Sequence, residues 1–202
     1  MSQGVIKQIE GRAVPFPEDN VDTDQIAPTQ EALYVVNWEE LADVFCVKHR
    51  LKADGSINQE CVLNDPRYQG ARILIGGRNF GCGSSREHAT QGTKARYDAV
   101  VALSFAPIYA DNAYAIGLPA VEIDETSMST LLGIVRSDPQ TVLSLDLETK
   151  AISRNSQRVS LHIDEAKRQG FLQGTWDERA RLYENLLKTR AILDNSAYVR
   201  GY

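Results

Sequence analysis

Cysteine is scarce in this chain, and the positions of its cysteines exclude several kinds of site. The sequence of 202 residues contains three, Cys46, Cys61 and Cys82. They are odd in number, far apart and form no Cys-x-x-Cys pair. This argues against a disulfide framework, a zinc knuckle or an iron–sulfur cluster held by this chain alone. We therefore expect no metal site made from its own residues, and we interpret Cys46 and Cys61 as small apolar side chains of the core.

Long hydrophobic segments and clusters of positive charge are also missing. No apolar run approaches the roughly 20 residues that span a bilayer, and the N-terminus MSQGVIKQIEGRAVPF lacks the apolar core of a signal peptide. The net charge is −5 and no basic cluster stands out, so neither a membrane nor a nucleic acid is an expected partner. With 43% hydrophobic and 24% charged residues, the composition is typical of a globular protein, which we expect in the cytoplasm.

Strand and helix patterns alternate along the middle of the chain. Residues 4–14 suit a first strand or hairpin arm, and the segment 15–28, rich in Pro and Asp, is expected to be mostly turn. Continuous apolar runs predict further strands at 72–75, 99–104, 118–123, 141–147 and 158–163. Capping residues and helical periodicity predict helices at 37–45, 84–97, 106–117 and 126–139.

This alternation indicates an α/β fold with a mostly parallel sheet and right-handed crossovers. No repeat and no low-complexity linker divides the chain. We therefore expect a single domain over residues 1–202, with a core from about 4 to 165 and a C-terminal helical appendage from about 166 to 195.

The segment GGRNFGCGSSREHA (76–89) concentrates polar side chains where a buried strand passes into a helix. In open α/β sheets, ligands bind at the carboxyl ends of the strands. Gly81 and Gly83 permit backbone angles that other residues avoid, and a helix start attracts negative charge. Arg86, expected in the first helical turn, offers a planar fork for a carboxylate or phosphate. The segment predicts an anion-binding site.

An alternative interpretation of Ser84 is structural. Ser84-x-x-Glu87 has the spacing of a capping box, in which both side chains satisfy backbone groups at the helix start. Three catalytic or nucleotide-binding motifs are excluded by spacing: the P-loop, the dinucleotide fingerprint and the Gly-x-Ser-x-Gly nucleophile turn.

The segment NFGCGSSREHA is similar to the signature of the small subunit of 3-isopropylmalate dehydratase, a family homologous to the swivelling domain of aconitase. AVPFPEDNVDTDQIAP resembles the family's N-terminal signature, and SFAPIYADNAYAIGLPAV resembles a further conserved segment. The resemblance covers about residues 4–123. It implies an aconitase-like swivelling β/β/α domain and a hydro-lyase of hydroxy-dicarboxylates that is active only with a large subunit.

The resemblance also implies a division of labour between two subunits of a heterodimer. The large subunit carries a [4Fe-4S] cluster as Lewis acid, and the small subunit supplies the base. Isomerisation of 2-isopropylmalate to 3-isopropylmalate, in leucine biosynthesis, is the favoured reaction. Related hydratases of citraconate, dimethylmalate or homoaconitate remain alternatives. A different class, a non-catalytic anion-binding module, also stays open, because the same loop could bind an anion without chemistry.

Roles for individual residues follow from matching the family's motifs. Ser84 is expected to take the α-proton as an alkoxide, and Ser85 and Arg86 to hold a substrate carboxylate. Asp24 is expected in the active site, orienting an arginine or histidine, with an Asx-turn or a helix cap as the alternative. Glu87 and His88 are expected to support these residues, although a lone histidine is often structural. The supporting and substrate-selecting candidates are Glu87, His88, Leu33 and Tyr34.

Leu33 and Tyr34 belong to the loop at 28–38, which is expected to choose the variable group of the substrate. No arginine lies between Arg12 and Arg50, so an apolar lining is expected there instead of a site for a third carboxylate. The alternative is that these apolar side chains only pack the loop onto the core.

Overall fold

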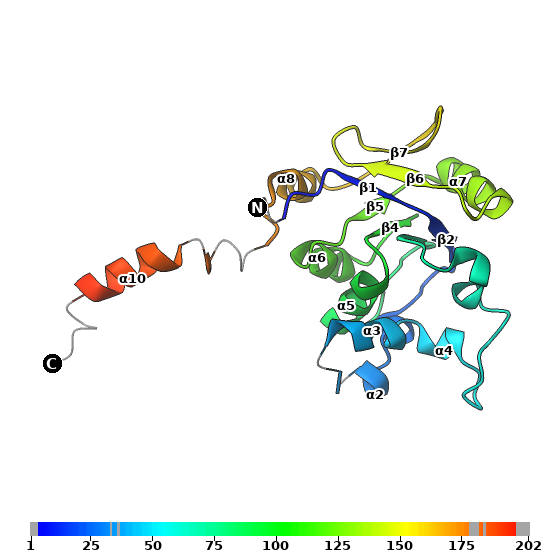
Figure 1. The fold of residues 1–202 in the computed structure, drawn as a ribbon, viewed down its shortest axis with the longest axis horizontal. Coiled ribbons are helices and arrows are strands. Elements are labelled where there is room, and N and C mark those ends of the chain that lie inside the picture. The colour runs from blue at the N-terminus through cyan, green and yellow to red at the C-terminus, as the bar shows by residue number, and fades with distance from the viewer. Residues whose placement is uncertain (1–3, 33, 36, 178–181, 184, 197–202) are drawn as a thin grey trace.

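Two four-stranded sheets form the body of the protein (Figure 1). The computed structural model describes residues 4–32, 34–35, 37–177, 182–183 and 185–196. The parallel sheet has the order β2-β3-β4-β5, and the antiparallel sheet has the order β1-β6-β7-β8. The parallel strands are β2 (Ala13–Pro15), β3 (Ile73–Ile75), β4 (Ala99–Ala102) and β5 (Ala120–Glu122). The antiparallel strands are β1 (Gln8–Gly11), β6 (Leu143–Asp146), β7 (Ala151–Arg154) and β8 (Gln157–Ser160).

Helices connect the strands and cover the sheets. The longer ones are α3 (Trp38–Val44), α5 (Glu87–Arg96), α6 (Pro107–Ala115), α7 (Glu125–Ser137), α8 (Glu165–Gln173) and α10 (Leu186–Asn195). The short ones are α1 (Thr23–Ile26), α2 (Thr29–Ala32), α4 (Val47–Arg50), η1 (Val62–Asn64) and η2 (Pro66–Tyr68). Helix α5 packs between α3 and α6, and α7 contacts both β2 and β8, which joins the two sheets. None of the described helices is long and apolar enough to cross a membrane.

Burial differs between the two sheets because their faces are covered to different extents. Every residue of β3 and β4 is buried, because helices and the other layer cover both faces of the parallel sheet. In β6, Leu143 and Leu145 are buried while Ser144 and Asp146 are partly exposed. This alternation is typical of an antiparallel sheet with one face toward solvent.

The expected strands and helices of the middle of the chain are confirmed, with differences in how they assemble. The segment 4–14 is not one strand: it supplies β1 to the antiparallel sheet, changes sheet at Arg12 and continues as β2. The strand expected at 141–147 joins the antiparallel sheet, paired with β1, and β7 was not predicted. The expectation of a mostly turn segment at 15–28 is wrong for Thr23–Ile26, which form α1.

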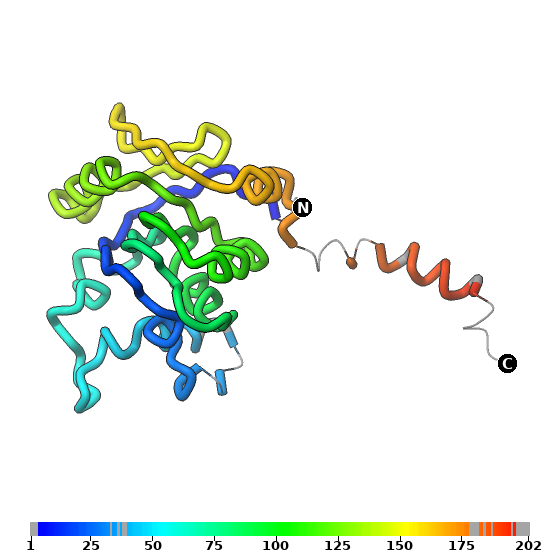
Figure 2. Tube along the Cα trace, turned by 180° about the vertical axis from the view of Figure 1, so that it is seen from behind, coloured from blue at the N-terminus to red at the C-terminus, as the bar shows by residue number. Residues whose placement is uncertain are grey.

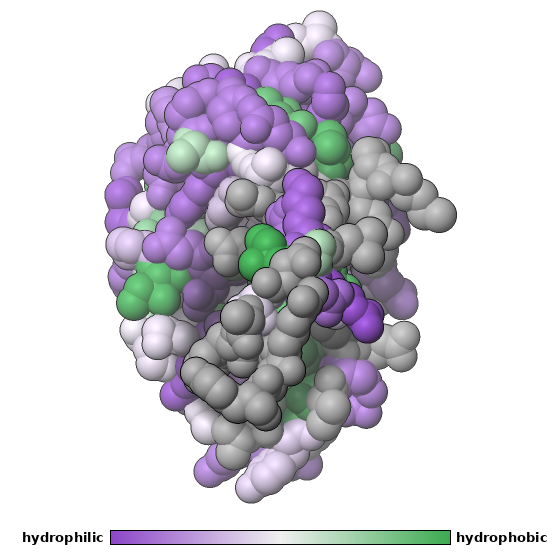
Figure 3. All heavy atoms as spheres, turned by 90° about the vertical axis from the view of Figure 1, so that its left-hand side faces the viewer, coloured by the Kyte–Doolittle hydropathy of each residue, from purple (hydrophilic) through white to green (hydrophobic). Residues whose placement is uncertain are grey.

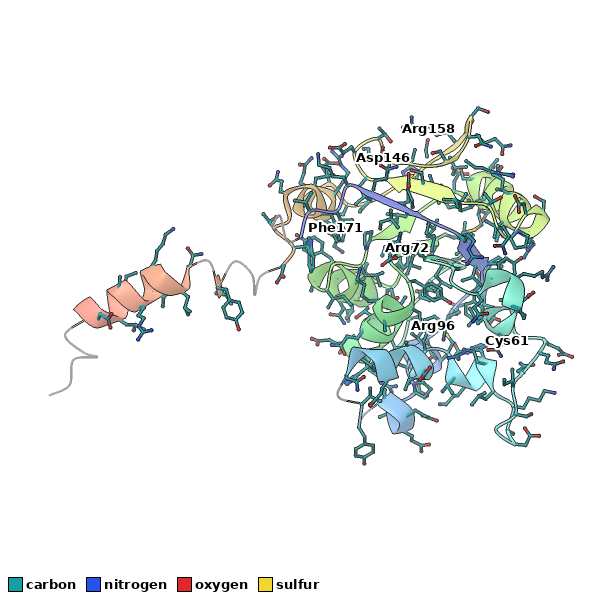
Figure 4. The ribbon with its side chains drawn as sticks, viewed as in Figure 1. Cys61, Arg72, Arg96, Asp146, Arg158 and Phe171 are labelled. Carbon is teal, nitrogen blue, oxygen red and sulfur yellow. The ribbon has the colours of Figure 1, made fainter. Side chains whose placement is uncertain are left out.

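The packed body extends beyond residue 165, where we expected the core to end. Phe171 of α8, labelled in Figure 4, is 1% exposed, and its carbonyl accepts a hydrogen bond from the Ile6 N–H at 2.8 Å. The indole Nε1 of Trp176 donates to the Gly4 carbonyl. Helix α8 is therefore part of the packed body rather than of an appendage.

Helix α10 stands apart from the two-sheet body (Figure 2). The C-terminal helical appendage expected from about 166 to 195 is described only in part, because residues 178–181 and 184 lie outside the described residues. Several of its apolar side chains are exposed, among them Leu186 and Ile192 at 57% and 71%. Viewed from the α10 side, the molecule is mainly hydrophilic with separate hydrophobic patches (Figure 3).

Candidate active site

Two loops meet at the carboxyl edge of the parallel sheet. The β2 loop (residues 16–22) leaves β2, and the β3 loop (residues 76–86) leaves β3; because the two strands are neighbours, both loops leave at the same edge. Backbone hydrogen bonds of 2.8 Å connect Asn20 N–H to Arg78 O, Gly81 N–H to Val21 O and Thr23 N–H to Cys82 O. The two sequence signatures therefore form one structural unit.

Two glycines of the β3 loop allow this close approach. A Cβ atom on Gly77 would lie 2.3 Å from the Glu18 carbonyl oxygen of the β2 loop. A Cβ atom on Gly81 would lie 2.2 Å from the ring of Tyr109, and Gly81 has a φ of +78°. Larger residues would push the β3 loop away from the β2 loop and from the buried ring.

Gly81→Ala is expected to destabilise the fold far more than Gly55→Ala. Both glycines have nearly the same φ, +78° and +80°, so each substitution costs about 1–2 kcal/mol of backbone strain. Nothing lies within 4 Å of a Cβ on Gly55, whereas one on Gly81 meets a buried ring, which adds a further ~1–3 kcal/mol. Free energies of unfolding in denaturant measure the difference. Equal losses in the two variants would show that the β3 loop relaxes around the added methyl group.

The helix cap of α1 is Asp22, and this leaves the Asp24 carboxylate free for another role. Asp22 Oδ1 accepts from the Asp24 and Gln25 N–H groups at 2.7 and 2.8 Å, and Gln25 Oε1 accepts from the Asp22 N–H at 2.8 Å. This is a complete capping box. Asp24 is therefore not the cap of α1.

Asp24 lies between two cations. Its Oδ1 is 2.5 Å from Arg86 Nη1, and its Oδ2 is 3.0 Å from Lys48 Nζ. The Thr29 N–H and hydroxyl donate to Oδ1 at 3.2 and 3.3 Å. The Arg86 guanidinium lowers the pKa of the Asp24 carboxyl well below its usual value, with smaller contributions from Lys48 and Thr29. Asp24 is thus ionised throughout the neutral range.

Helix α5 begins at Glu87, three residues later than expected, and Ser84 does not cap it. Its N-cap is Arg86, and no side chain caps the helix start. Ser84 is exposed, and its Oγ lies 3.3 Å from Oγ1 of the buried Thr23, which also donates to the Ser84 carbonyl at 3.1 Å. The reason is that Gly83 and the Thr23 contact hold residues 83–85 in the loop. The Ser84-x-x-Glu87 capping box is therefore not formed.

Among the described residues, the other predicted side chains make no hydrogen bond or ion pair with Ser84, Asp24 or Arg86. Ser85 and Glu87 are exposed and His88 is partly buried. Tyr34 is 82% exposed. Leu33 lies outside the described residues. The roles assigned to these five residues stay predictions.

Thr23 and Lys48 complete the site and were not predicted from the sequence. Thr23 lies between the two aspartates of the Asp-Thr-Asp signature, and this position was the signal in the sequence that could have found it. Lys48 comes from α4, in a segment with no motif. The Cys46 N–H donates to the Ile26 carbonyl at 2.8 Å, which ties the start of α4 to the end of α1 and brings Lys48 to Asp24.

The cysteines do not form a metal site. Cys82 lies in the β3 loop, where its S–H donates to the Asn20 carbonyl at 3.4 Å and burial raises the pKa of its thiol. Cys46 is buried in the core. Among the described residues, no group of three or more His, Cys, Asp or Glu side chains could hold a metal ion. The described residues of this chain therefore do not fit an iron–sulfur cluster.

The arrangement can hold an anion beside an exposed hydroxyl. Arg86 and Lys48 contribute two positive charges against the one negative charge of Asp24. The uncapped start of α5 adds backbone N–H groups and the positive end of the helix dipole. Ser84 is exposed next to both features, so its Oγ is accessible to a bound molecule.

A family model and a solved structure are both similar to this chain. The family model described as the aconitase C-terminal domain matches residues 3–126. The crystal structure of 3-isopropylmalate dehydratase (LeuD) from Methanocaldococcus jannaschii is similar with a TM-score of 0.64 and 25% identity, over 88% of this chain and 98% of that one.

Sequence relatives extend the similarity over most of the chain. The 3-isopropylmalate dehydratase small subunit of Roseiflexus castenholzii is 39% identical over 84% of this chain and 83% of its own length. That of Thermus thermophilus is 37% identical over 87% of both chains. That of Chloroflexus aurantiacus is 40% identical over 84% of this chain and 85% of its own length. The chain therefore belongs to the family of 3-isopropylmalate dehydratase small subunits, with the fold of the aconitase C-terminal domain.

Proposed function

We propose that this chain is the small subunit of a hydro-lyase that interconverts 2-isopropylmalate and 3-isopropylmalate in leucine biosynthesis, and that it acts in the cytoplasm. The observation that carries the proposal is the joining of Ser84, Arg86 and Asp24 at one sheet edge by two loops that are distant in sequence. The relatives are 3-isopropylmalate dehydratase small subunits, which supports this reaction. They favour an enzyme over a non-catalytic anion-binding module.

Ser84 would act on the proton at the substrate α-carbon. An alkoxide forms only where positive charge stabilises it, and the start of α5 and Arg86 supply that charge. Arg86 would hold a carboxylate through two parallel N–H···O bonds, with Ser85 donating a further hydrogen bond from its exposed hydroxyl. Asp24 would orient the Arg86 guanidinium through the 2.5 Å contact, and Glu87 and His88 would support the start of α5.

A large subunit would complete the enzyme. We propose that it carries a [4Fe-4S] cluster, which supplies Lewis-acid chemistry at the substrate hydroxyl. Two properties of this chain support a divided site. Its cysteines do not form a cluster site among the described residues, and Ser84 and Ser85 are exposed rather than enclosed. An exposed base is unproductive in water, so a partner surface would have to close over it.

The loop at 28–38 would select the substrate's variable group. Tyr34 is 82% exposed and Val35 packs partly against the core. An exposed aromatic ring on this loop is available to a substrate or partner that approaches the site. We propose that Tyr34, together with Leu33, contacts an alkyl group, which favours isopropylmalate over a substrate with a third carboxylate.

The experiment is reconstitution with a large subunit of the family, followed by turnover of a substrate panel. The isolated chain is expected to be colourless and inactive, because its described residues provide no cluster ligands. The reconstituted enzyme is expected to show a higher kcat/KM for isopropylmalate than for citraconate or cis-aconitate. An active, brown preparation of this chain alone would contradict the divided site. A preference for cis-aconitate would contradict the alkyl-binding loop.

A further inference from the structure

Two asparagines face each other where the β2 loop and the β3 loop run side by side. The Asn79 Nδ2 group donates to Asn20 Oδ1 at 2.9 Å, and the Asn20 N–H donates to the Arg78 carbonyl at 2.8 Å. The Asn20 carbonyl accepts from the Cys82 S–H at 3.4 Å. The Asn79 N–H donates to the hydroxyl of Ser104, just after β4, at 2.8 Å. We call Asn20 and Asn79 the asparagine pair.

Both members of the asparagine pair have a left-handed backbone. The φ angle is +57° at Asn20 and +54° at Asn79. This conformation is unfavourable for residues with a side chain, although asparagine tolerates it better than most. Among the described residues other than glycine, only Cys46, Lys150 and Asn155 also adopt it. Glycine would adopt it without strain but could not form the bond between the two side chains.

The two loops keep one register on both sides of the asparagine pair. In the parallel sheet, Ala13 of β2 pairs with Ile73 of β3, a separation of 60 positions. The ladder is then interrupted, and it resumes as an isolated parallel bridge between Asp22 and Cys82, which are again 60 positions apart. The asparagine pair lies between these two places. It therefore bonds the loops to each other where the ladder is interrupted.

The register of the loops decides which residues meet at the candidate active site. Beyond the asparagine pair, the Thr23 hydroxyl donates to the Ser84 carbonyl at 3.1 Å, and Arg86 Nη1 lies 2.5 Å from Asp24 Oδ1. Each contact joins a residue that follows the β2 loop to a residue of the β3 loop. A shift by one residue moves an extended chain by about 3.5 Å. Such a shift between the loops would break both contacts.

We propose that Asn20 and Asn79 are positioning residues for the reaction proposed above. The asparagine pair holds the β2 loop and the β3 loop in register, and it thereby places Ser84 and Arg86 beside Asp24. It acts through the loop backbones and not on the substrate. The inference depends on the proposed function, because that function assigns the reaction to the side chains that the loops carry.

Aspartate at each position tests the bond between the two side chains. Asn20→Asp or Asn79→Asp alone keeps the bond, because the remaining amide, turned over where necessary, donates to the carboxylate. The double variant has two acceptors and no donor. In the reconstituted two-subunit enzyme, each single substitution is expected to change kcat for isopropylmalate less than about threefold, and the double variant to lower it by roughly 10- to 100-fold.

The comparison of single and double variants also accounts for the added charge. Two negative charges near the site repel a dicarboxylate, but this effect acts mainly on KM and is already present in the single variants. Effects of independent substitutions multiply. A double variant whose kcat equals the product of the two single effects would overturn the proposal.

Glycine variants separate the side-chain bond from backbone strain. Asn79→Gly keeps the left-handed conformation and removes the bond, so it is expected to lower kcat about 10-fold with KM changed less than about threefold. Asn155→Gly is the matched control. Asn155 has a φ of +51° in the turn between β7 and β8 and makes no side-chain hydrogen bond to the described residues. Equal losses of kcat at the two positions would contradict a specific role of the asparagine pair.

Amide hydrogen exchange in the isolated chain separates this inference from the proposed function. The Gly81 and Thr23 N–H groups bond across the two loops, whereas the Gly76 N–H bonds to β4. In the double aspartate variant, exchange is expected to be about 10-fold faster at Gly81 and Thr23 and to stay within about twofold at Gly76. Unchanged exchange at Gly81 and Thr23 would overturn the role of the pair.

Two further outcomes have distinct meanings. Faster exchange at Gly81 and Thr23 together with an unchanged kcat would show that the asparagine pair serves the fold alone, which overturns the positioning role. Failure of the reconstituted wild-type enzyme to turn over any hydroxy-dicarboxylate would instead overturn the proposed function.

Discussion

Replacing Ser84 with alanine is expected to slow proton exchange at the substrate α-carbon by roughly 10²- to 10⁴-fold in the reconstituted enzyme. The hydroxyl would accept the proton as an alkoxide, and an alanine side chain offers no acceptor in its place. Ser85 precedes Arg86 and is assigned to carboxylate binding, so Ser85→Ala is expected to raise KM more than it lowers kcat. Hydrogen–deuterium exchange from the α-carbon, followed by NMR, measures the step directly.

The same substitution is expected to leave the fold nearly unchanged. Ser84 is exposed and does not cap α5, so its loss removes only the 3.3 Å contact with the Thr23 hydroxyl. One such contact contributes at most about 1 kcal/mol to the free energy of unfolding. Thermal unfolding of the isolated chain would show this.

A serine outside the two loops, in α7, provides the control. Ser129→Ala removes an exposed hydroxyl that donates to the Glu125 carbonyl at 2.9 Å within α7. It is expected to change neither proton exchange nor stability measurably. If Ser84→Ala exchanges the α-proton at close to the wild-type rate, Ser84 is not the base and the assignment of the catalytic residue is wrong.

The parallel sheet could be predicted from the sequence because its strands are short and entirely apolar. β3 and β4 are buried along their whole length, and short continuous apolar runs are typical of strands in a sheet that is covered on both faces. The position of the β3 loop at the carboxyl edge followed from the same reasoning. Capping residues and helical periodicity predicted helices at 106–117 and 126–139, and the observed ends of α6 and α7 lie within a few residues of these bounds.

The second sheet was harder to predict because the pairing of its strands is not local. The segment at 141–147 follows a helix, as the parallel strands β4 and β5 do. It nevertheless pairs with β1 near the N-terminus. Its alternation of buried Leu143 and Leu145 with polar neighbours was the available signal. β7 carries Ser153 and Arg154 at partly exposed positions and therefore lacks a strong strand pattern.

The contacts of the candidate site could be predicted only where a motif contained them. The Asp-Thr-Asp and Ser-Ser-Arg segments are 61 to 62 positions apart, and only the neighbouring strands β2 and β3 bring them together. Helix propensity placed Ser84 at the start of α5, whereas the tertiary contact with Thr23 keeps it in the loop. Lys48 reaches Asp24 through α4, which is held by bonds from residues distant in sequence, such as the Asn64 side chain to the Arg50 carbonyl, and no local pattern encodes them.

Arg86→Lys is expected to lower kcat/KM for isopropylmalate by roughly 10- to 100-fold, although the charge is kept. An ammonium group can still form an ion pair with Asp24, so the electrostatic field of the site changes little. It cannot offer two parallel N–H groups to a second carboxylate, and this geometry is the property that the substitution removes. The loss is therefore expected mainly in KM. It is expected to persist at high salt, because dissolved ions weaken the attraction between charges but do not change the hydrogen-bond geometry that the substitution removes.

The matched control is Arg72→Lys. Arg72, labelled in Figure 4, also forms a 2.5 Å ion pair with an aspartate, Asp98, but it precedes β3 and lies at the opposite edge of the parallel sheet. Its substitution is expected to change kcat/KM less than twofold, because an exposed pair of this kind contributes about 0–1 kcal/mol to stability and none to the site. Steady-state kinetics of both variants, at low and high ionic strength, make the comparison. Equal effects at Arg72 and Arg86 would mean that Arg86 serves the fold alone, and the substrate carboxylate would then have to bind to residues of the large subunit.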